Sequence, residues 1–142
     1  MNADELARTV AEKLRSLEGT GAAWNIELED AREGYARIAM VVRADMLNGH
    51  RTCHGGMIFA LADTAFAYAC NSRNVETVAQ NATITFLAPG REGERLVAEC
   101  REVSLAGRSG VYAVTVSNPA GEKIAVFQGL SRSLGGPVLA PD

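Results

Sequence analysis

The longest apolar run in the chain is GGMIFALADTAFAYAC, residues 55–70, with Asp63 near its middle. It is shorter than the ~20 residues that a helix needs to cross a bilayer, and it carries a charge. We therefore expect a core helix of a water-soluble protein over residues 55–71. Large apolar side chains point to every side of this helix, namely Met57, Ile58, Phe59, Leu61, Phe66 and Tyr68. Such a helix has to be covered all round, which predicts that a sheet wraps it.

The segments on either side of this run supply the sheet and one more helix. Residues 3–17 have apolar residues at helical spacing with charges between them, which predicts an amphipathic helix that ends at Gly19-Thr20-Gly21. Strand-like segments cover residues 24–28, 35–42, 77–87, 95–105, 110–117 and 123–133, and Arg32-Glu33-Gly34 joins the first two as a hairpin connection. Short connections in the second half favour an antiparallel sheet over crossover units. The predicted class is α+β: a central apolar helix wrapped by a curved antiparallel sheet, with an extra N-terminal helix, which describes the hotdog fold.

Composition limits the number of domains and the kinds of partner. The 142 residues fit a single domain, residues 1–142. Fourteen basic against seventeen acidic residues give no general attraction to nucleic acid or to anionic membranes, so we expect neither as a partner. Three cysteines without a CxxC pair indicate a reducing compartment, and the charged N-terminal residues exclude a signal peptide, so the expected location is the cytoplasm. A small antiparallel sheet has free edges, which favours pairing with a second copy.

Asp63 is the anomaly of the apolar helix, because it is the only carboxylate between His54 and Glu76. Burying an unpaired carboxylate costs several kcal/mol. Either Asp63 is structural and is satisfied by Thr64, Asn71 or the backbone, or it has a chemical role.

Two neighbouring features favour the chemical role. The helix begins at His54-Gly55-Gly56, where residues without side chains expose backbone N–H groups at the positive end of the helix dipole, an arrangement suited to an oxyanion. Asn48, just upstream, either forms a plain turn or orients a carbonyl or a water.

Several segments together resemble hotdog acyl-CoA thioesterases of the phenylacetyl-CoA (PaaI-type) group. The signature is LNGH at 47–50 and HGG at 54–56, followed by LADTA at 61–65. The resemblance continues through AYACN at 67–71, TITFLAPG at 83–90, GVY at 110–112 and GG at 135–136, so it covers most of the chain beyond the first helix.

This resemblance implies an activity and an assembly. The implied reaction is hydrolysis of an acyl-CoA thioester with a phenylacetyl or hydroxylated phenylacetyl group. The implied assembly is a homotetramer built from hotdog dimers, without a metal or a redox cofactor.

The resemblance also assigns roles to individual residues. It implies that Asp63 attacks the thioester or activates water, that the Gly55 amide forms the oxyanion hole, and that Asn48 and His54 support them. For substrate binding it points to Gly56 and, for coenzyme A, to residues on loops and late strands: Arg108, Ser109, Gly110 and Arg132.

The same residues allow other interpretations. His50 and His54 have the spacing of a zinc pair, but the neighbouring glycines place them in a loop and no acidic third ligand follows at a fixed interval, so we expect no metal site. A hotdog dehydratase or hydratase would use His54 and Asp63 for proton transfer. A non-catalytic acyl-CoA binding module would leave Asp63 structural.

The spacing of Gly55 and Asp63 predicts a shared site. The two residues are eight positions apart, which is about 12 Å along a helix, whereas one carbonyl has to lie within ~3 Å of both the oxyanion donor and the attacking group. We therefore expect the Gly55 amide of one protomer to work with Asp63 of its partner.

Overall fold

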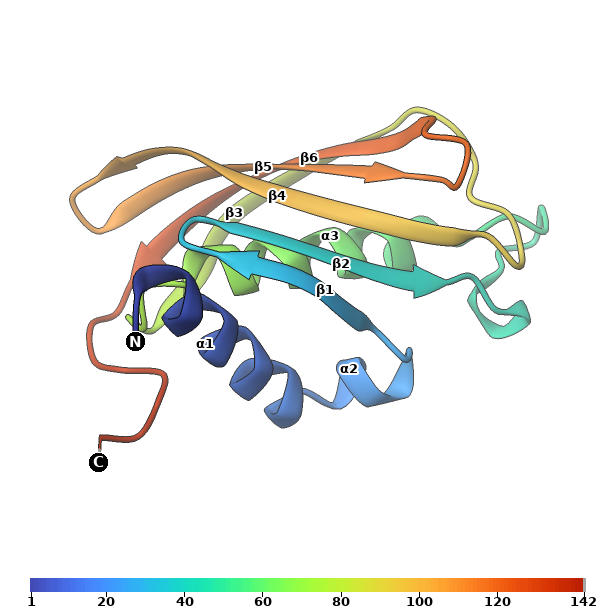
Figure 1. Ribbon diagram of the computed structural model, residues 1–142. Coiled ribbons are helices and arrows are strands. Elements are labelled where there is room, and N and C mark those ends of the chain that lie inside the picture. The colour runs from blue at the N-terminus through green and yellow to red at the C-terminus, as the bar shows by residue number, and fades with distance from the viewer. Residues whose placement is uncertain (142) are drawn as a thin grey trace.

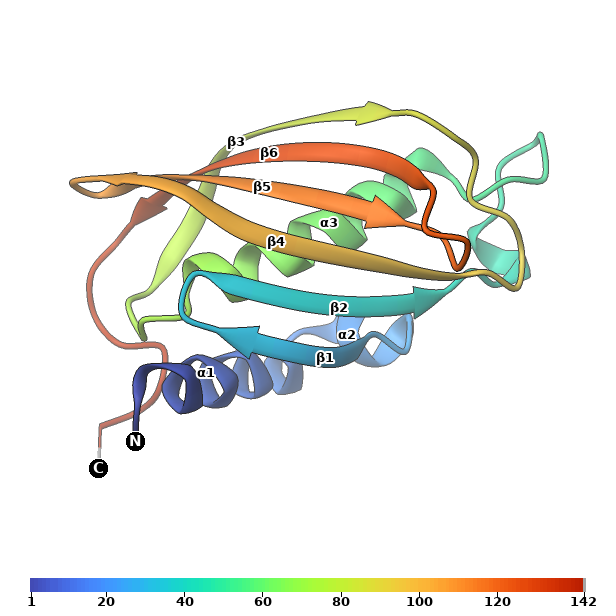
Figure 2. The same cartoon turned by 45° about the horizontal axis from the view of Figure 1, so that its top comes forward.

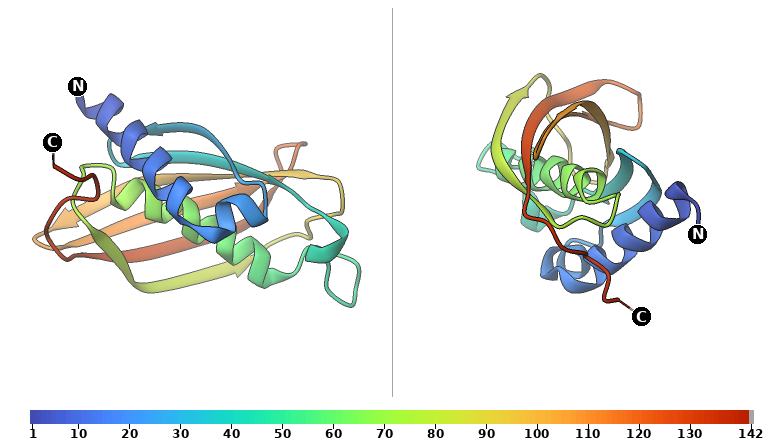
Figure 3. Two further views of the ribbon diagram at one scale, coloured as in Figure 1. Left: turned by 90° about the horizontal axis from the view of Figure 1, so that it is seen from below. Right: turned by 90° about the vertical axis from the view of Figure 1, so that its left-hand side faces the viewer.

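The computed structural model describes residues 1–141 as helices packed on one curved antiparallel sheet (Figure 1). The elements in chain order are α1 (Ala3–Leu17), α2 (Gly19–Ala23), β1 (Glu27–Arg32), β2 (Tyr35–Val41), the 3-10 turn η1 (Ala44–Met46), α3 (Gly55–Cys70), β3 (Thr77–Phe86), β4 (Arg95–Ala106), β5 (Ser109–Ser117) and β6 (Lys123–Ser133). The six strands lie in the order β1-β2-β4-β5-β6-β3. The predicted hotdog architecture is confirmed: the sheet curves around α3, and α1 lies beyond it (Figure 3).

The position of α3 inside the sheet depends on a large side chain opposite a glycine. Phe66 is 1% exposed, and its ring centroid lies 5.5 Å from that of Tyr112 on β5 and 5.8 Å from that of Phe127 on β6. Gly129 on β6 faces the same ring, and a Cβ at position 129 would lie 2.6 Å from it. Only a residue without a side chain therefore lets β6 approach α3 this closely.

Helix α1 has the predicted bounds and buries a narrow strip of residues. Its first turn is closed by a capping box in which Asn2 Oδ1 accepts the Glu5 N–H (2.8 Å) and Glu5 Oε2 accepts the Asn2 N–H (3.2 Å). The fully buried residues are Ala7, Val10 and Ala11, whereas Leu17 is 67% exposed. Two alanines in the buried strip allow α1 to lie close to β1 and α3.

The segment between α1 and β2 differs most from the prediction. Gly19-Thr20-Gly21 was expected to end the first helix, but Gly19 begins the short helix α2. The first strand was expected at 24–28 and instead runs Glu27–Arg32, because Asn25 has a positive φ of 50° and turns the chain before the strand begins. The hairpin to β2 is therefore only Glu33–Gly34, one residue shorter than expected.

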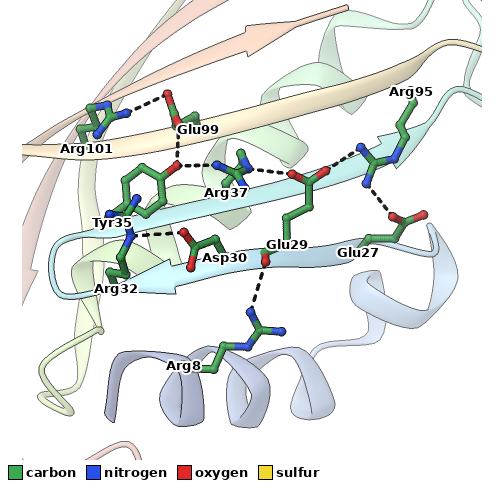
Figure 4. A network of polar contacts seen from close by, with 10 residues as sticks. All are labelled: Arg8, Glu27, Glu29, Asp30, Arg32, Tyr35, Arg37, Arg95, Glu99 and Arg101. Atoms are coloured by element: carbon green, nitrogen blue, oxygen red, sulfur yellow. Dashed lines mark hydrogen bonds and ion pairs between the residues drawn. The ribbon is translucent and has the colours of Figure 1, made fainter. Parts of the chain in front are cut away.

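The bounds of β1 were not predicted correctly because its outer face is polar. Glu29 accepts from Arg37 on β2 (2.7 Å) and forms an ion pair with Arg95 on β4 (2.5 Å), so charged side chains link three strands (Figure 4). Burial opposes ionisation of Glu29, but the hydrogen bonds from these two arginines lower the pKa of its carboxyl. A strand stabilised by cross-strand ion pairs lacks the apolar alternation by which strands are normally recognised.

The remaining bounds match the prediction within a residue or two. Within residues 1–141 no helix is long and apolar enough to cross a membrane; α3, the most apolar, has 16 residues.

Candidate functional site

A cavity of about 600 Å³ lies along one side of α3. Its walls come from α1, from α3, from the start of β3 and from the C-terminal tail after β6. The lining includes Asp63, Phe66 and Cys70 from α3. It includes Thr77 and Val78 from β3. The cavity brings together segments that are far apart in the sequence.

One face of α3 is left uncovered toward this side. Positions 56, 60, 63, 67 and 70 follow one another at intervals of three or four residues, and none of them is fully buried. The expectation that α3 is covered on every side is therefore wrong for this face. The physical reason is that the face carries Gly, Ala, Asp, Ala and Cys, while the large apolar side chains lie mostly on the other faces.

Asp63 is the only ionisable carboxyl group on this uncovered face, and no group in the described chain satisfies it. Its carboxylate forms no hydrogen bond or ion pair within residues 1–141. The Thr64 hydroxyl donates to the Ala60 carbonyl (2.7 Å), and the Asn71 side chain donates to the Thr77 carbonyl (3.0 Å) and accepts the Thr77 N–H (2.9 Å). The structural alternative, in which Thr64 or Asn71 holds Asp63, is therefore wrong.

Burial raises the pKa of the Asp63 carboxyl above its ordinary value, and no cation offsets this effect. A carboxylate with a raised pKa is a better proton acceptor than one at the surface. A perturbed, unpartnered acid in the wall of a cavity is a typical feature of a reactive site.

The start of α3 keeps one backbone donor free. His54 is the N-cap, and its Nδ1 accepts the Gly56 N–H at 2.9 Å. The Gly55 N–H has no acceptor among residues 1–141, so it is available to a ligand at the positive end of the helix dipole. The Phe86 ring lies against Gly55, and a Cβ at position 55 would lie 3.0 Å from Phe86 Cζ.

Asn48 holds the loop that leads into α3. Its Oδ1 accepts the N–H groups of His50 (2.9 Å) and Thr52 (3.1 Å), and its Nδ2 donates to Thr52 Oγ1 (3.1 Å). The sequence allowed Asn48 either to form a turn or to orient a carbonyl or a water, and in the structure its side chain forms the turn. Its contribution to a site is to fix the loop before His54 and Gly55.

The four residues expected to bind coenzyme A gather at the β4–β5 turn. Arg108, Ser109 and Gly110 line a second hollow of about 140 Å³, and Arg132 is the β6 partner of Ser109. This turn lies near the C-terminal end of α3, whereas the loop before Gly55 lies at the opposite end of the molecule (Figure 2). Within one chain the expected CoA-binding residues and the expected oxyanion donor are therefore separated by the length of α3.

Several lining residues of the larger cavity were not predicted. These are Glu18, Pro137 and Val138, which line the cavity with Asp63. The Glu18 carboxylate accepts a hydrogen bond from the Tyr68 hydroxyl. No sequence signal marks them, because only the path of α1 and of the tail brings them to α3.

Comparison with known proteins gives consistent results. Residues 50–125 match the family model described as the thioesterase superfamily. The chain is 44% identical over 116 residues to the acyl-coenzyme A thioesterase PaaI of Escherichia coli K12, which covers 82% of this chain and 83% of that protein. The structure of the E. coli PaaI protein, from the phenylacetic acid degradation operon, superposes with a TM-score of 0.94 at 39% identity over 96% of this chain and 99% of that chain.

A more distant structure was determined with a ligand. The Streptococcus mutans protein smu.793, bound to acetyl CoA, superposes with a TM-score of 0.77 at 25% identity over 80% of this chain and 91% of that chain.

The unpartnered carboxylate leads to a prediction about stability. A carboxyl whose pKa is higher in the folded than in the unfolded state favours folding only when it is protonated, so its ionised form destabilises the fold above the folded pKa. Asp63→Asn should therefore raise the Tm at pH 7 by a few degrees, and the gain should vanish below the unfolded pKa of about 3.9. Thermal unfolding followed by circular dichroism at both pH values measures this. Asp30→Asn, on the outer face of β1, is the control and should show no gain; a loss of Tm in Asp63→Asn at pH 7 would contradict the assignment.

Proposed function

This chain belongs to the thioesterase superfamily, and we propose that it hydrolyses aryl-acyl-CoA thioesters, phenylacetyl-CoA or its hydroxylated forms, to the free acid and coenzyme A. The observation that carries the proposal is the unpartnered Asp63 carboxylate in the wall of the 600 Å³ cavity. The acyl group is suggested by the similarity to PaaI of E. coli and by the space and apolar lining beside Asp63.

The proposed chemistry needs only water as a second reactant. The Asp63 carboxylate either takes a proton from the water that attacks the thioester carbon or attacks that carbon itself. The negative charge that develops on the carbonyl oxygen is held by the Gly55 N–H. The carbon–sulfur bond then breaks, and coenzyme A leaves as the thiolate and takes up a proton. On the water route this releases the free acid directly, whereas after direct attack the acyl group is left on Asp63 as an anhydride, which water then hydrolyses to the free acid and the carboxylate. We expect no metal or redox cofactor in this reaction.

The functional assignment is tested by release of free thiol from phenylacetyl-CoA. Asp63→Asn keeps the size of the side chain but removes its basicity and nucleophilicity, so kcat should fall by ~10²–10⁴-fold while the fold is retained. The control variant, Asp30→Asn, should keep wild-type turnover. Near wild-type turnover of a pure Asp63→Asn preparation would show that Asp63 is not the reacting group.

Two other activities predict different results with the same protein. A dehydratase or hydratase using His54 and Asp63 would change enoyl-CoA absorbance without releasing thiol. A non-catalytic module would bind acyl-CoA and leave both signals unchanged.

The arrangement of the strands supports a dimer with shared sites. Within residues 1–141, β3 pairs only with β6 and has an open outer edge, on which Val78 is 43% and Phe86 is 50% exposed. The other sheet edge, β1, is charged and contacts α1. A second copy is therefore expected at β3.

Two-fold pairing at β3 would bring Asp63 of one protomer close to Gly55 of the other. Gly55 lies at the Phe86 end of β3, whereas the Asp63 cavity is lined by Thr77 and Val78 at the other end. Antiparallel pairing of β3 with its copy places these two ends side by side, so each site would combine Asp63 of one protomer with Gly55 of the other. The tetramer that the family resemblance implies would be assembled from two such dimers.

The shared site predicts complementation between two inactive variants. Gly55→Pro deletes the amide at a helix position that tolerates proline, and Asp63→Asn deletes the acid, so each homodimer should be nearly inactive. In a heterodimer one site has both defects and the other has neither, so co-refolding at equal amounts should restore roughly a quarter of wild-type activity.

The controls for this experiment separate steric effects from loss of the donor. Gly55→Ala adds the same contact with Phe86 but keeps the N–H, and should be more active than Gly55→Pro. Heterodimers demonstrated by native mass spectrometry without any return of activity would refute the shared site.

The arginines near the β4–β5 turn are proposed to bind the phosphates of coenzyme A, with Ser109 and Gly110 as neighbouring contacts, while Gly56 at the start of α3 is proposed to contact the substrate near Gly55. Arg108 and Arg132 are both exposed, and the register of β5 and β6 brings their positions close together. Replacing either by Ala should raise KM for acyl-CoA and leave turnover of a truncated thioester without the nucleotide almost unchanged. Equal losses on both substrates would remove these arginines from the proposed binding site, and Arg91→Ala, in the loop before β4, serves as the matched control.

A further inference from the structure

After β6 the C-terminal tail folds back onto the rest of the structure. Gly135 and Gly136 have positive φ values of 78° and 81°, a backbone conformation that glycine adopts without strain. They turn the tail out of the sheet and toward the side of the molecule on which α1 lies (Figure 3).

Four hydrogen bonds fix this tail to the connection between α3 and β3. The side chain of Asn74 makes two of them: its Oδ1 accepts the N–H groups of Val138 (3.0 Å) and Leu139 (2.8 Å). The backbone of Glu76 makes the other two, donating to the Gly136 carbonyl (2.9 Å) and accepting the Leu134 N–H (2.8 Å). The tail is therefore held at a defined position rather than by packing alone.

The tail fixed in this way forms part of the cavity that contains Asp63. Pro137 and Val138 line this cavity together with Leu14 and Leu17 of α1. These four apolar residues come from the two ends of the chain, whereas Asp63 lies on the central helix.

We propose that the cavity lined by Asp63 holds the acyl group, and that the tail segment 136–139, positioned by Asn74, is the wall of this cavity that sets the size of the acyl group accepted. The inference rests on the proposed thioesterase function and adds a specificity-determining residue, Val138, and a positioning residue, Asn74. An apolar wall contributes to binding in proportion to the acyl surface that it covers. A large acyl group therefore depends on the tail, and a group as small as acetyl does not.

Two kinds of variant separate the role of Val138 in the cavity wall from the role of Asn74, whose hydrogen bonds hold the tail in place. Val138→Trp fills the cavity with a larger side chain and keeps the backbone N–H that donates to Asn74 Oδ1. Asn74→Gly removes the acceptor of two hydrogen bonds while keeping a residue that tolerates the φ of 64° at this position. The matched control is Asn118→Gly, because Asn118 Oδ1 also accepts two backbone N–H groups, those of Ala120 (3.1 Å) and Glu122 (3.0 Å), but lies in the β5–β6 turn outside the cavity lining.

The experiment compares kcat/KM for phenylacetyl-CoA with that for the smallest acyl-CoA that the wild-type enzyme hydrolyses. Val138→Trp should lower the ratio about tenfold, the effect of a misfit in an apolar pocket, and should do so through the phenylacetyl substrate alone. Asn74→Gly should lower the same ratio through KM and should speed hydrogen exchange at the Val138 and Leu139 amides. Asn118→Gly should leave the ratio at the wild-type value.

The possible failures are distinguishable. If the wild-type enzyme hydrolyses both substrates and neither variant changes the ratio, the tail is not the specificity wall and the thioesterase function stands. If Asn74→Gly does not fold, Val138→Trp decides the proposal alone, since it lies beyond the last strand. A wild-type protein inactive on every acyl-CoA would overturn the proposed function and the tail proposal together.

Discussion

The packing of the Phe66 ring against Gly129 is the contact on which the arrangement of the candidate site depends. Because a Cβ at position 129 would lie 2.6 Å from the ring, this glycine allows β6 to approach α3, and the aromatic side chains of β5 and β6 enclose Phe66. The contact fixes the rotation of α3 about its own axis. With that rotation fixed, Asp63 lies on the side that the sheet leaves open, where it lines the cavity. The placement of the acid is thus a consequence of core packing.

The two edges of the sheet are protected in different ways, and the difference supports the proposed pairing of two copies at β3. At β1, Glu29 pairs with Arg37 and Arg95, and α1 packs alongside the strand. Charges and a covering helix are common means of blocking an edge. At β3 no such protection exists within residues 1–141, and apolar side chains are exposed there. The unprotected edge is also the strand that runs from the Asp63 cavity to Gly55.

The sequence was sufficient to predict elements whose signal is local and apolar. The run at 55–70 predicted α3 and the hotdog fold, and Asp63 became a candidate because it is the only carboxylate in that run. The strand β1 was misplaced because its stability comes from ion pairs with other strands. The short helix α2 was not predicted because the glycines at 19 and 21 are more typical of a helix end than of a helix. Val138 and Glu18 reach the cavity only through the paths of the tail and of α1. Such long-range contacts leave no trace in local periodicity.

Two physical demands explain why a site of this kind would require two copies of the same helix. A free N–H for an oxyanion exists only in the first turn of a helix, since later amides are bonded within it. An acid whose pKa is raised by burial has to be at least partly removed from solvent, and on α3 this condition is met near the middle of the helix, at Asp63. One straight helix holds these groups about 12 Å apart, and no side-chain rotamer of aspartate closes that distance. Two antiparallel helices satisfy both demands, because the start of each lies beside the middle of the other.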